Sequence, residues 1–277
     1  RSYRLLAIAY LGKNNNEMAR VSVIEMLRLN PNYKPDIIND PSNLVALITS
    51  VNIIPKFSLG ISFALGSNTN LPEITSVYML NNQTKTYSTQ TNTQLSIASS
   101  FQLNKHLSIV GMARLVPKAY DLSIAFDSWD IDVSEQLNYL QVPLMLKVNP
   151  LYGKRIRPYF QAGAYTGFLL STINSFYAQN YNSDANFSLI NLSSYERRNN
   201  MEWGACVGGG LDIKLGNGIL SLNSNYFRSM TNITSVESRY NHPEISFPFY
   251  YLDDDIKFHN LSISLGYALI LNYKVLD

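Results

Sequence analysis

A period of two dominates the chain from about Phe57 to Tyr273, where apolar and polar positions alternate in segments of about ten residues or more. In the segment 57–66, odd positions are large and apolar, and even positions are small or polar. Successive side chains of a strand point to opposite faces, so this segment predicts a strand with one apolar face. That face carries Phe57, Leu59, Ile61, Phe63 and Leu65.

Eight such segments are expected along the chain. Three of the connections between them, near 104–106, 150–155 and 215–218, are short turns, and the other four are several times longer. Short turns at one end and long loops at the other are typical of outer-membrane barrels. The sequence therefore predicts an all-β fold, an eight-stranded antiparallel transmembrane β-barrel. The expected strands are 57–66, 92–103, 107–120, 136–149, 156–171, 200–214, 219–231 and 257–273.

The first 50 residues or so follow a helical period instead. Two antiparallel helices are expected at 1–12 and 16–29, the second ending at Asn30-Pro31. A third runs from Asp40-Pro41 to about Ser50, with Asp40 as its N-cap. The apolar positions with helical spacing are Leu6, Tyr10, Ala19, Val23, Leu27 and Leu29. We assign 1–52 to a small N-terminal helical segment and 53–277 to the barrel, joined through about 50–56.

The spacing of Leu6, Tyr10, Ala19 and Pro31 is similar to the second half of a tetratricopeptide repeat. A plain helical hairpin is the alternative. Because one repeat cannot bury its own apolar face, we expect either further repeats before Arg1 or packing of this pair on something else.

Composition fits a barrel better than a helical membrane protein. Charged residues make up 15% of the chain, against about 25% in an ordinary soluble domain. Aromatic residues reach 12%, with 19 tyrosines, yet the mean hydropathy is only −0.07. No stretch approaches the 18 or so apolar residues that a membrane helix needs. The net charge of +2 indicates no nucleic-acid partner.

A soluble lipocalin-like barrel is the competing fold, because it is also up-and-down and eight-stranded. Alternation alone does not say which face points inward. The polar face carries small residues and few charges, including Arg114, Lys147, Arg157, Asp212 and Lys214. This suits a narrow lumen better than a soluble surface, so we favour the membrane barrel. Eight strands leave an interior that side chains fill, which argues against a general solute channel.

Candidate chemistry is sparse, and we expect no cofactor, metal or catalytic residue. The single cysteine, Cys206, is interpreted as a small packed residue of a strand. The enzymatic alternative is an outer-membrane enzyme that hydrolyses or transfers lipid A acyl chains, using His259 with Ser246 or Ser262. The acidic run 253–255 has the oxygen ligands of a cation site, but a solvated acidic loop is the preferred interpretation.

Several stretches of the barrel resemble the PorT-like outer-membrane β-barrel family of Bacteroidota. They are Tyr139-Leu-Gln-Val-Pro-Leu-Met-Leu-Lys147, Arg157-Pro-Tyr-Phe-Gln-Ala-Gly-Ala-Tyr165, Gly204-Ala-Cys-Val-Gly-Gly-Gly-Leu-Asp212, Gly218-Ile-Leu-Ser-Leu-Asn-Ser-Asn-Tyr226 with Ile233, and Asn260-Leu-Ser-Ile-Ser-Leu-Gly-Tyr267. The resemblance covers about 57–274. It implies a role in envelope biogenesis and, for the family's name-giving member, in the type IX secretion system. The helical N-terminal segment departs from a barrel-only pattern and implies docking.

The sequence thus predicts a non-catalytic accessory subunit that anchors and docks partners in an envelope secretion or assembly complex. It is expected in the bacterial outer membrane, in contact with lipopolysaccharide and larger envelope proteins, with the N-terminal helices and the C-terminus in the periplasm. Candidate surfaces are the apolar helix faces and the loops 67–91, 121–135, 172–199 and 232–256. The candidate partner-binding residues are Leu6, Tyr10, Val23, Leu27, Phe247, Phe249, Tyr250 and Tyr251.

Overall fold

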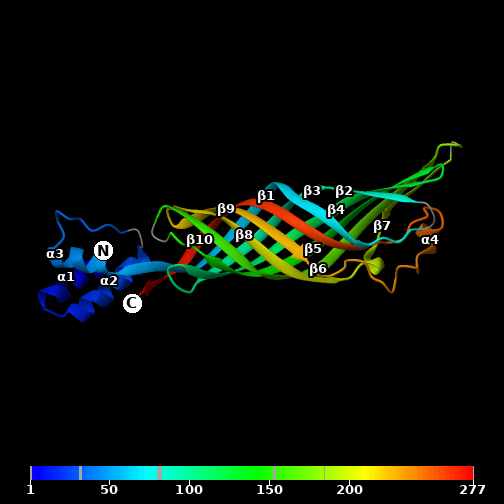
Figure 1. Cartoon of the computed structure of the whole chain (residues 1–277). Coiled ribbons are helices and arrows are strands. Elements are labelled where there is room, and N and C mark those ends of the chain that lie inside the picture. Colours follow the sequence, from blue (N-terminus) through cyan, green and yellow to red (C-terminus); the bar gives the residue numbers. More distant parts are fainter. Residues whose placement is uncertain (1, 31–32, 80–82, 152–153, 184, 277) are drawn as a thin grey trace.

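A closed β-barrel with a small helical unit at one end makes up the chain (Figure 1). The computed structural model describes residues 2–30, 33–79, 83–151, 154–183 and 185–276, without the side chains of 52, 62–68, 275 and 276. Among the predicted features, Arg1, Pro31 and the side chains of Phe63 and Leu65 lie outside the described residues.

The helical unit has the three predicted helices: α1 (Ser2–Gly12), α2 (Asn16–Leu29) and α3 (Ser42–Ser50). Asn15 caps α2, because its side chain accepts a hydrogen bond from the Met18 amide at 3.1 Å. Ala7, Val23, Leu27, Leu44 and Ile48 are among the buried residues that hold the three helices together.

The predicted capping role of Asp40 is wrong, because Pro41 occupies the N-cap position of α3. The buried carboxylate of Asp40 instead accepts hydrogen bonds from Arg4 of α1 and from the Asp36 amide, the latter at 2.8 Å. Burial alone would raise the pKa of Asp40, but these hydrogen bonds outweigh it and hold that pKa below its usual value. Asp40 therefore ties the segment before α3 to α1.

Eight antiparallel strands close into a ring in the order β1–β3–β4–β5–β6–β8–β9–β10, with β10 pairing back onto β1. The predicted eight-stranded barrel is confirmed. The ring strands are β1 (Asn52–Ser76), β3 (Thr91–Gln102), β4 (Leu107–Phe126), β5 (Trp129–Val148), β6 (Ile156–Asn180), β8 (Met201–Leu215), β9 (Gly218–Ser229) and β10 (Asp255–Leu276).

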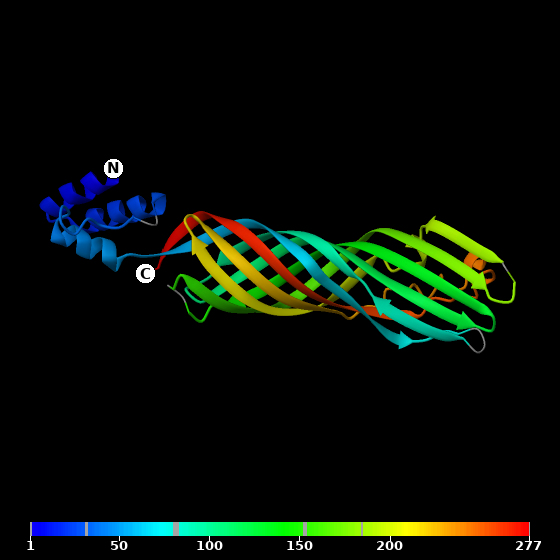
Figure 2. The ribbon, with the colours of Figure 1, turned by 90° about the horizontal axis from the view of Figure 1, so that it is seen from above.

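The three predicted short turns, the start of β1 and the end of β10 lie on the same side, next to the helical unit (Figure 2). We call this the turn end. The opposite end carries β2 (Thr84–Thr89) on the edge of β4, β7 (Asn186–Leu192) on the edge of β6, the short 3-10 helix η1 (Tyr195–Arg197) and the short helix α4 (Pro243–Ser246). Residues 230–254, which include α4, form what we call the cap, and this is the cap end.

Several strands are much longer than predicted, so the predicted loops are shorter. The loop expected at 121–135 is wrong, because β4 continues to Phe126 and a turn at 127–128 leads directly into β5. Strand β6 likewise continues to Asn180, into the loop expected at 172–199, and β1 extends to Ser76, into the loop expected at 67–91. Strand β1 also starts at Asn52, inside the expected linker 50–56.

On β5 the exterior of the barrel is apolar near the turn end. On β5, Leu144, Leu146 and Val148 point outward and are about half exposed, whereas Gln141 and Met145 point inward and are buried. From Leu140 to Val148 the strand covers about 27 Å, or about 20 Å along the barrel axis at a tilt of about 40°. This is close to the apolar belt of about 25 Å that outer-membrane barrels carry.

Toward the cap end, the two faces of the same strands exchange character. On β5, Asp132 and Ser134 point outward, whereas Ile131, Val133 and Leu137 point inward and are fully buried. The inward residues join a hydrophobic core with side chains of β4, β6, β10 and the cap. Along β5 the wall is therefore apolar outside and polar inside near the turn end, and polar outside and apolar inside near the cap end.

Candidate functional site

The cap is attached to the cap end by aromatic packing. Phe249 and Tyr251 of the cap each place their rings 5.2 Å from the ring of Phe176 on β6. Ile233 and Ile245 are also buried in this core. Four large apolar side chains of the cap thus replace solvent above the inward faces of the strands.

Three consecutive aspartates at the junction of the cap and β10 form the ion pairs of this attachment. Asp253 pairs with Arg197 at 2.9 Å and with Arg198 at 2.7 Å, and it accepts a hydrogen bond from Tyr251. Burial would raise the pKa of Asp253, but Arg198 and then Arg197 outweigh it and keep that pKa below its usual value. Asp253 is therefore a buried carboxylate held in its charged form.

The neighbouring aspartates have their own cations. Asp254 pairs with Lys85 of β2 at 2.9 Å and accepts the amide of Tyr78 at 2.6 Å. Asp255 pairs with Arg239 of the cap and accepts a hydrogen bond from Asn232 at 2.7 Å. Both earlier interpretations of 253–255 are wrong, because these carboxylates are neither a cation site nor a solvated loop. They form an ionic hub that joins β2, the cap and the segment 195–198.

Arg198 links this hub to the barrel wall. Its guanidinium donates to Glu135 of β5 at 2.9 Å and lies fully buried. Glu135 also accepts a hydrogen bond from Ser194 at 2.5 Å and one from Tyr120. A buried charge is tolerated only where it is paired and hydrogen-bonded, and here each charge has several partners.

A second polar layer crosses the lumen below the apolar core. Lys118 on β4 donates to both carboxylate oxygens of Glu202 on β8, at 2.8 and 2.6 Å. Gln141 on β5 donates to the same carboxylate at 2.6 Å. The Lys118 ammonium also lies 4.7 Å from the ring centre of Tyr139. Side chains from three strands thus fill the cross-section at this level.

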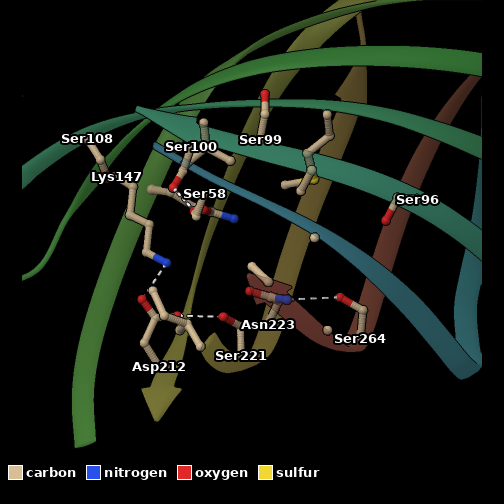
Figure 3. A pocket seen from close by; sticks show the side chains of 18 of the residues that line it. Ser58, Ser96, Ser99, Ser100, Ser108, Lys147, Asp212, Ser221, Asn223 and Ser264 are labelled. Atoms are coloured by element: carbon tan, nitrogen blue, oxygen red, sulfur yellow. Dashed lines mark hydrogen bonds and ion pairs between the residues drawn. The ribbon is translucent and has the colours of Figure 1, made fainter. Parts of the chain in front are cut away.

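Below this layer, a polar chamber of about 100 Å³ occupies the lumen toward the turn end (Figure 3). Lys147 on β5 pairs with Asp212 on β8 at 2.7 Å, and Ser221 donates to the other oxygen of Asp212 at 2.7 Å. Asn223 donates to Ser264 at 3.3 Å. Serine hydroxyls dominate the rest of the wall: Ser58, Ser96, Ser99, Ser100 and Ser108.

Arg114 forms the inner boundary of the chamber. Its guanidinium donates to Gln94 and, at 3.3 Å, to Asn260, and its carbon lies 3.8 Å from the ring centre of Phe227. Only 2% of Arg114 is exposed. Gln94, Lys147 and Asp212 also line the chamber, and every strand of the ring contributes at least one polar group to it.

The predicted partner-binding residues divide into two groups. Val23 and Leu27 are buried in the helical unit, and Phe249 and Tyr251 are buried in the cap, so these four pack inside the protein. Leu6 (42% exposed), Phe247 (78%) and Tyr250 (39%) are accessible, and Tyr10 is half-buried. For these four, a role in partner binding stays a prediction.

Of the residues proposed for lipid A chemistry, His259 and Ser262 do not come together as a catalytic pair. The ring of His259 lies between Glu73, at 2.6 Å, and Tyr226, so both ring nitrogens have partners. Ser262 is fully buried in the lumen, whereas His259 is on the outward face of β10 beside Arg228 of β9. The barrel wall therefore separates His259 from Ser262, and the other proposed nucleophile, Ser246, lies in α4 of the cap. Cys206 is buried, as predicted.

Neither a metal-binding cluster nor a membrane-spanning helix occurs among the described residues. No group of three or more His, Cys, Asp or Glu side chains there is arranged to hold a metal ion. None of the described helices is long and apolar enough to cross a membrane.

A closed ring of eight strands with an outward apolar belt and a polar lumen defines a membrane β-barrel. The sequence matches the family model described as outer membrane protein beta-barrel domain over residues 51–235. The chain belongs to this family, and the protein is an outer-membrane β-barrel. The soluble lipocalin-like alternative is therefore wrong. This family model is neither that of PorT-like barrels nor that of tetratricopeptide repeats, so the resemblances to those two families remain predictions.

Solved outer-membrane barrels are similar in outline. OprG from Pseudomonas aeruginosa is 13% identical with a TM-score of 0.42, over 78% of this chain and 96% of that one. Neisserial surface protein A is 10% identical with a TM-score of 0.38, over 79% and 99%. Ail of Yersinia pestis is 11% identical with a TM-score of 0.35, over 78% and 100%. No curated protein sequence matches the chain. At these values the likenesses carry no functional argument.

Proposed function

We propose that the protein is a non-catalytic anchor that docks another envelope protein through the helical unit at its turn end. The observation that carries this proposal is the surface of α1. Its sequence from Ser2 to Gly12 has a single charge, Arg4, yet only Ala7 is fully buried. A helix that is apolar on all sides is normally covered on all sides.

The exposed side of α1 presents Leu5 and Leu6, which are 61% and 42% exposed. The segment before α3 adds Ile37 and Ile38, at 83% and 92%. Single exposed apolar residues need no explanation, but several on one small unit are typical of a protein contact. The fitting partner is a protein with an apolar face, because burial of such side chains drives association.

The interior of the barrel supports an anchor rather than a conduit. The hydrophobic core, the ionic hub of 253–255 and the layer of Lys118, Glu202 and Gln141 occupy successive levels of the lumen. Opening a path would require breaking buried ion pairs, each of which is costly to separate.

In this proposal the turn end faces the periplasm, as short turns do in bacterial barrels. The helical unit, beyond the turn end in Figure 2, is then placed to meet periplasmic or outer-membrane subunits. The resemblance to PorT-like barrels connects such docking with an envelope secretion or assembly complex, of the type IX kind.

Gentle detergent extraction, affinity capture and mass spectrometry test the proposal. We expect one defined protein to be recovered with the full chain and lost from the Leu6→Glu variant. Because Leu6 is exposed, this change leaves the helical core intact. The matched control is Phe247→Glu, an exposed apolar residue of the cap, which should retain the partner.

Recovery of the protein alone and monomeric would overturn docking. Loss of the partner from Phe247→Glu but not from Leu6→Glu would move the contact to the cap end. Lipid A that changes in mass on deletion of the protein and on His259→Ala would instead favour the enzymatic alternative.

A further inference from the structure

The charges that line the chamber are unequal. Lys56, Arg114, Lys147 and Arg157 line it with one carboxylate, Asp212. The Lys147–Asp212 ion pair, at 2.7 Å, engages that carboxylate. Arg114 is the most deeply buried of these cations, and low-dielectric surroundings make a buried positive charge unfavourable unless an anion compensates it.

Arg114 is the cation whose surroundings are most informative. Its guanidinium contacts the neutral amides of Gln94 and Asn260 and the ring of Phe227. Its Nε–H is buried and has no hydrogen-bond acceptor among the described residues. A buried guanidinium normally has a carboxylate or phosphate to bond, because an unsatisfied charged donor is costly.

A second unsatisfied group lies on the same wall. The Ser262 hydroxyl is fully buried and also has no hydrogen-bond partner among the described residues. Ser262 is the next inward residue after Asn260 on β10, and Asn260 accepts a hydrogen bond from Arg114. Both residues line the chamber, so two buried donors without an acceptor belong to its wall.

We propose that this chamber binds a small oxyanion of the phosphate or sulfate type, with Arg114 and Ser262 as its principal donors. Oxyanions accept charge-assisted hydrogen bonds from guanidinium and hydroxyl groups. A chamber of about 100 Å³ holds several waters and hence one tetrahedral anion, but not a nucleotide. The inference is independent of the docking function.

Access is from the turn end. Lys147, Asp212 and Ser221 lie on the turn-end side of the chamber, whereas Arg114 and the layer of Lys118 and Glu202 close its other side. Lys147 neutralises Asp212 there, which lowers the repulsion that this carboxylate would exert on an entering anion. The anion therefore comes from the compartment that the turn end faces.

Titration of the full-length, detergent-folded protein with inorganic phosphate and with sulfate tests the proposal, by calorimetry at constant ionic strength with chloride as the balancing salt. We expect saturable binding of one anion per chain. Arg114→Gln should weaken binding about tenfold to a hundredfold, because a charged hydrogen-bond donor is lost. Arg228→Gln, an arginine on the barrel exterior, should leave binding unchanged.

Ser262→Ala keeps the test valid if Arg114→Gln fails to fold. Its hydroxyl has no hydrogen-bond partner among the described residues, so removing it should not disturb folding. We expect it to weaken phosphate binding several-fold. Absence of saturable binding to the wild-type protein would overturn the proposal. So would binding that Ser262→Ala and Arg114→Gln leave unchanged but Arg228→Gln abolishes, since the anion would then sit on the exterior.

Discussion

Replacing Arg198 with methionine should release the cap while leaving the barrel closed. Arg198 is fully buried and joins Glu135 of the wall, at 2.9 Å, to Asp253 at the base of the cap, at 2.7 Å. In Arg198→Met, two buried carboxylates lose a shared cation. Arg197 and Tyr251 still bond to Asp253, so the loss is partial for that carboxylate.

Removing one partner from a buried ion pair destabilises a protein by about 3–5 kcal/mol. Each 1.4 kcal/mol changes an equilibrium about tenfold, so the open population of the cap should rise roughly a hundredfold to a few thousandfold. Native-state hydrogen exchange measures this directly. The amides of Ile233, bonded to Ile256, and of Ser235, bonded to Arg197, are suitable reporters within the cap.

Arg228→Met is the matched control, because Arg228 forms an exposed pair with Glu73 at 3.6 Å. Exposed pairs contribute about 0–1 kcal/mol, so exchange in the cap should hardly change. The double variant Arg198→Met with Glu135→Gln should recover part of the loss by removing one uncompensated charge. If Arg198→Met and Arg228→Met had equal, small effects on cap exchange, the hub would not hold the cap.

Three further predictions concern the wall, the belt and pH. Gly163→Val should prevent barrel closure, because a Cβ at this position would lie 2.0 Å from the Leu144 carbonyl oxygen. The measurement is loss of heat-modifiable gel mobility. Gly12→Ala is the control and should be tolerated, because a Cβ there would meet no atom within 4 Å. Leu144→Lys should cost about 2–4 kcal/mol in urea unfolding from lipid vesicles, whereas Ser134→Lys, also outward on β5 but beyond the belt, should cost almost nothing. Equal costs would misplace the belt. Because the folded pKa of Asp253 lies below its usual 3.8, its contribution to cap stability should be complete above about pH 4 and lost as the pH falls through that lowered value. Exchange protection of the cap that declined between pH 7 and 5 would contradict this assignment.

The sequence predicted the helices and the strand cores well, because their periods are local. It missed the outer halves of β4, β5 and β6, although the signal was present. Along β5, odd positions point inward throughout, and only the chemistry changes, from Gln141 and Met145 to Ile131 and Val133. Asp130, Asp132 and Ser134 were taken for loop residues because they are polar, whereas they form the outward face of a strand.

The ionic hub and the chamber were beyond local patterns. Asp254 finds its cation in Lys85, and Asp253 finds its cations in Arg197 and Arg198, all far away in the sequence. No local pattern in the sequence near 253–255 predicts those ion pairs. Arg114 and Ser262, whose donors lack an acceptor, likewise lie on β4 and β10. These strands are distant in the sequence, and only the folded barrel places both residues in the wall of one chamber.

The reversal of polarity along the wall also sets how deep the protein sits in its membrane. On β5, the outward surface changes from Leu140 to Asn138 within one step of the pleat. Sinking by one more residue pair would bring polar groups into hydrocarbon, and rising would expose leucines to water, so both displacements are opposed. The change of polarity on the wall thus sets the position of the protein along the membrane normal, and this change is sharp on the cap side. A thicker or thinner bilayer would have to be accommodated at the turn end, which is where the helical unit is attached.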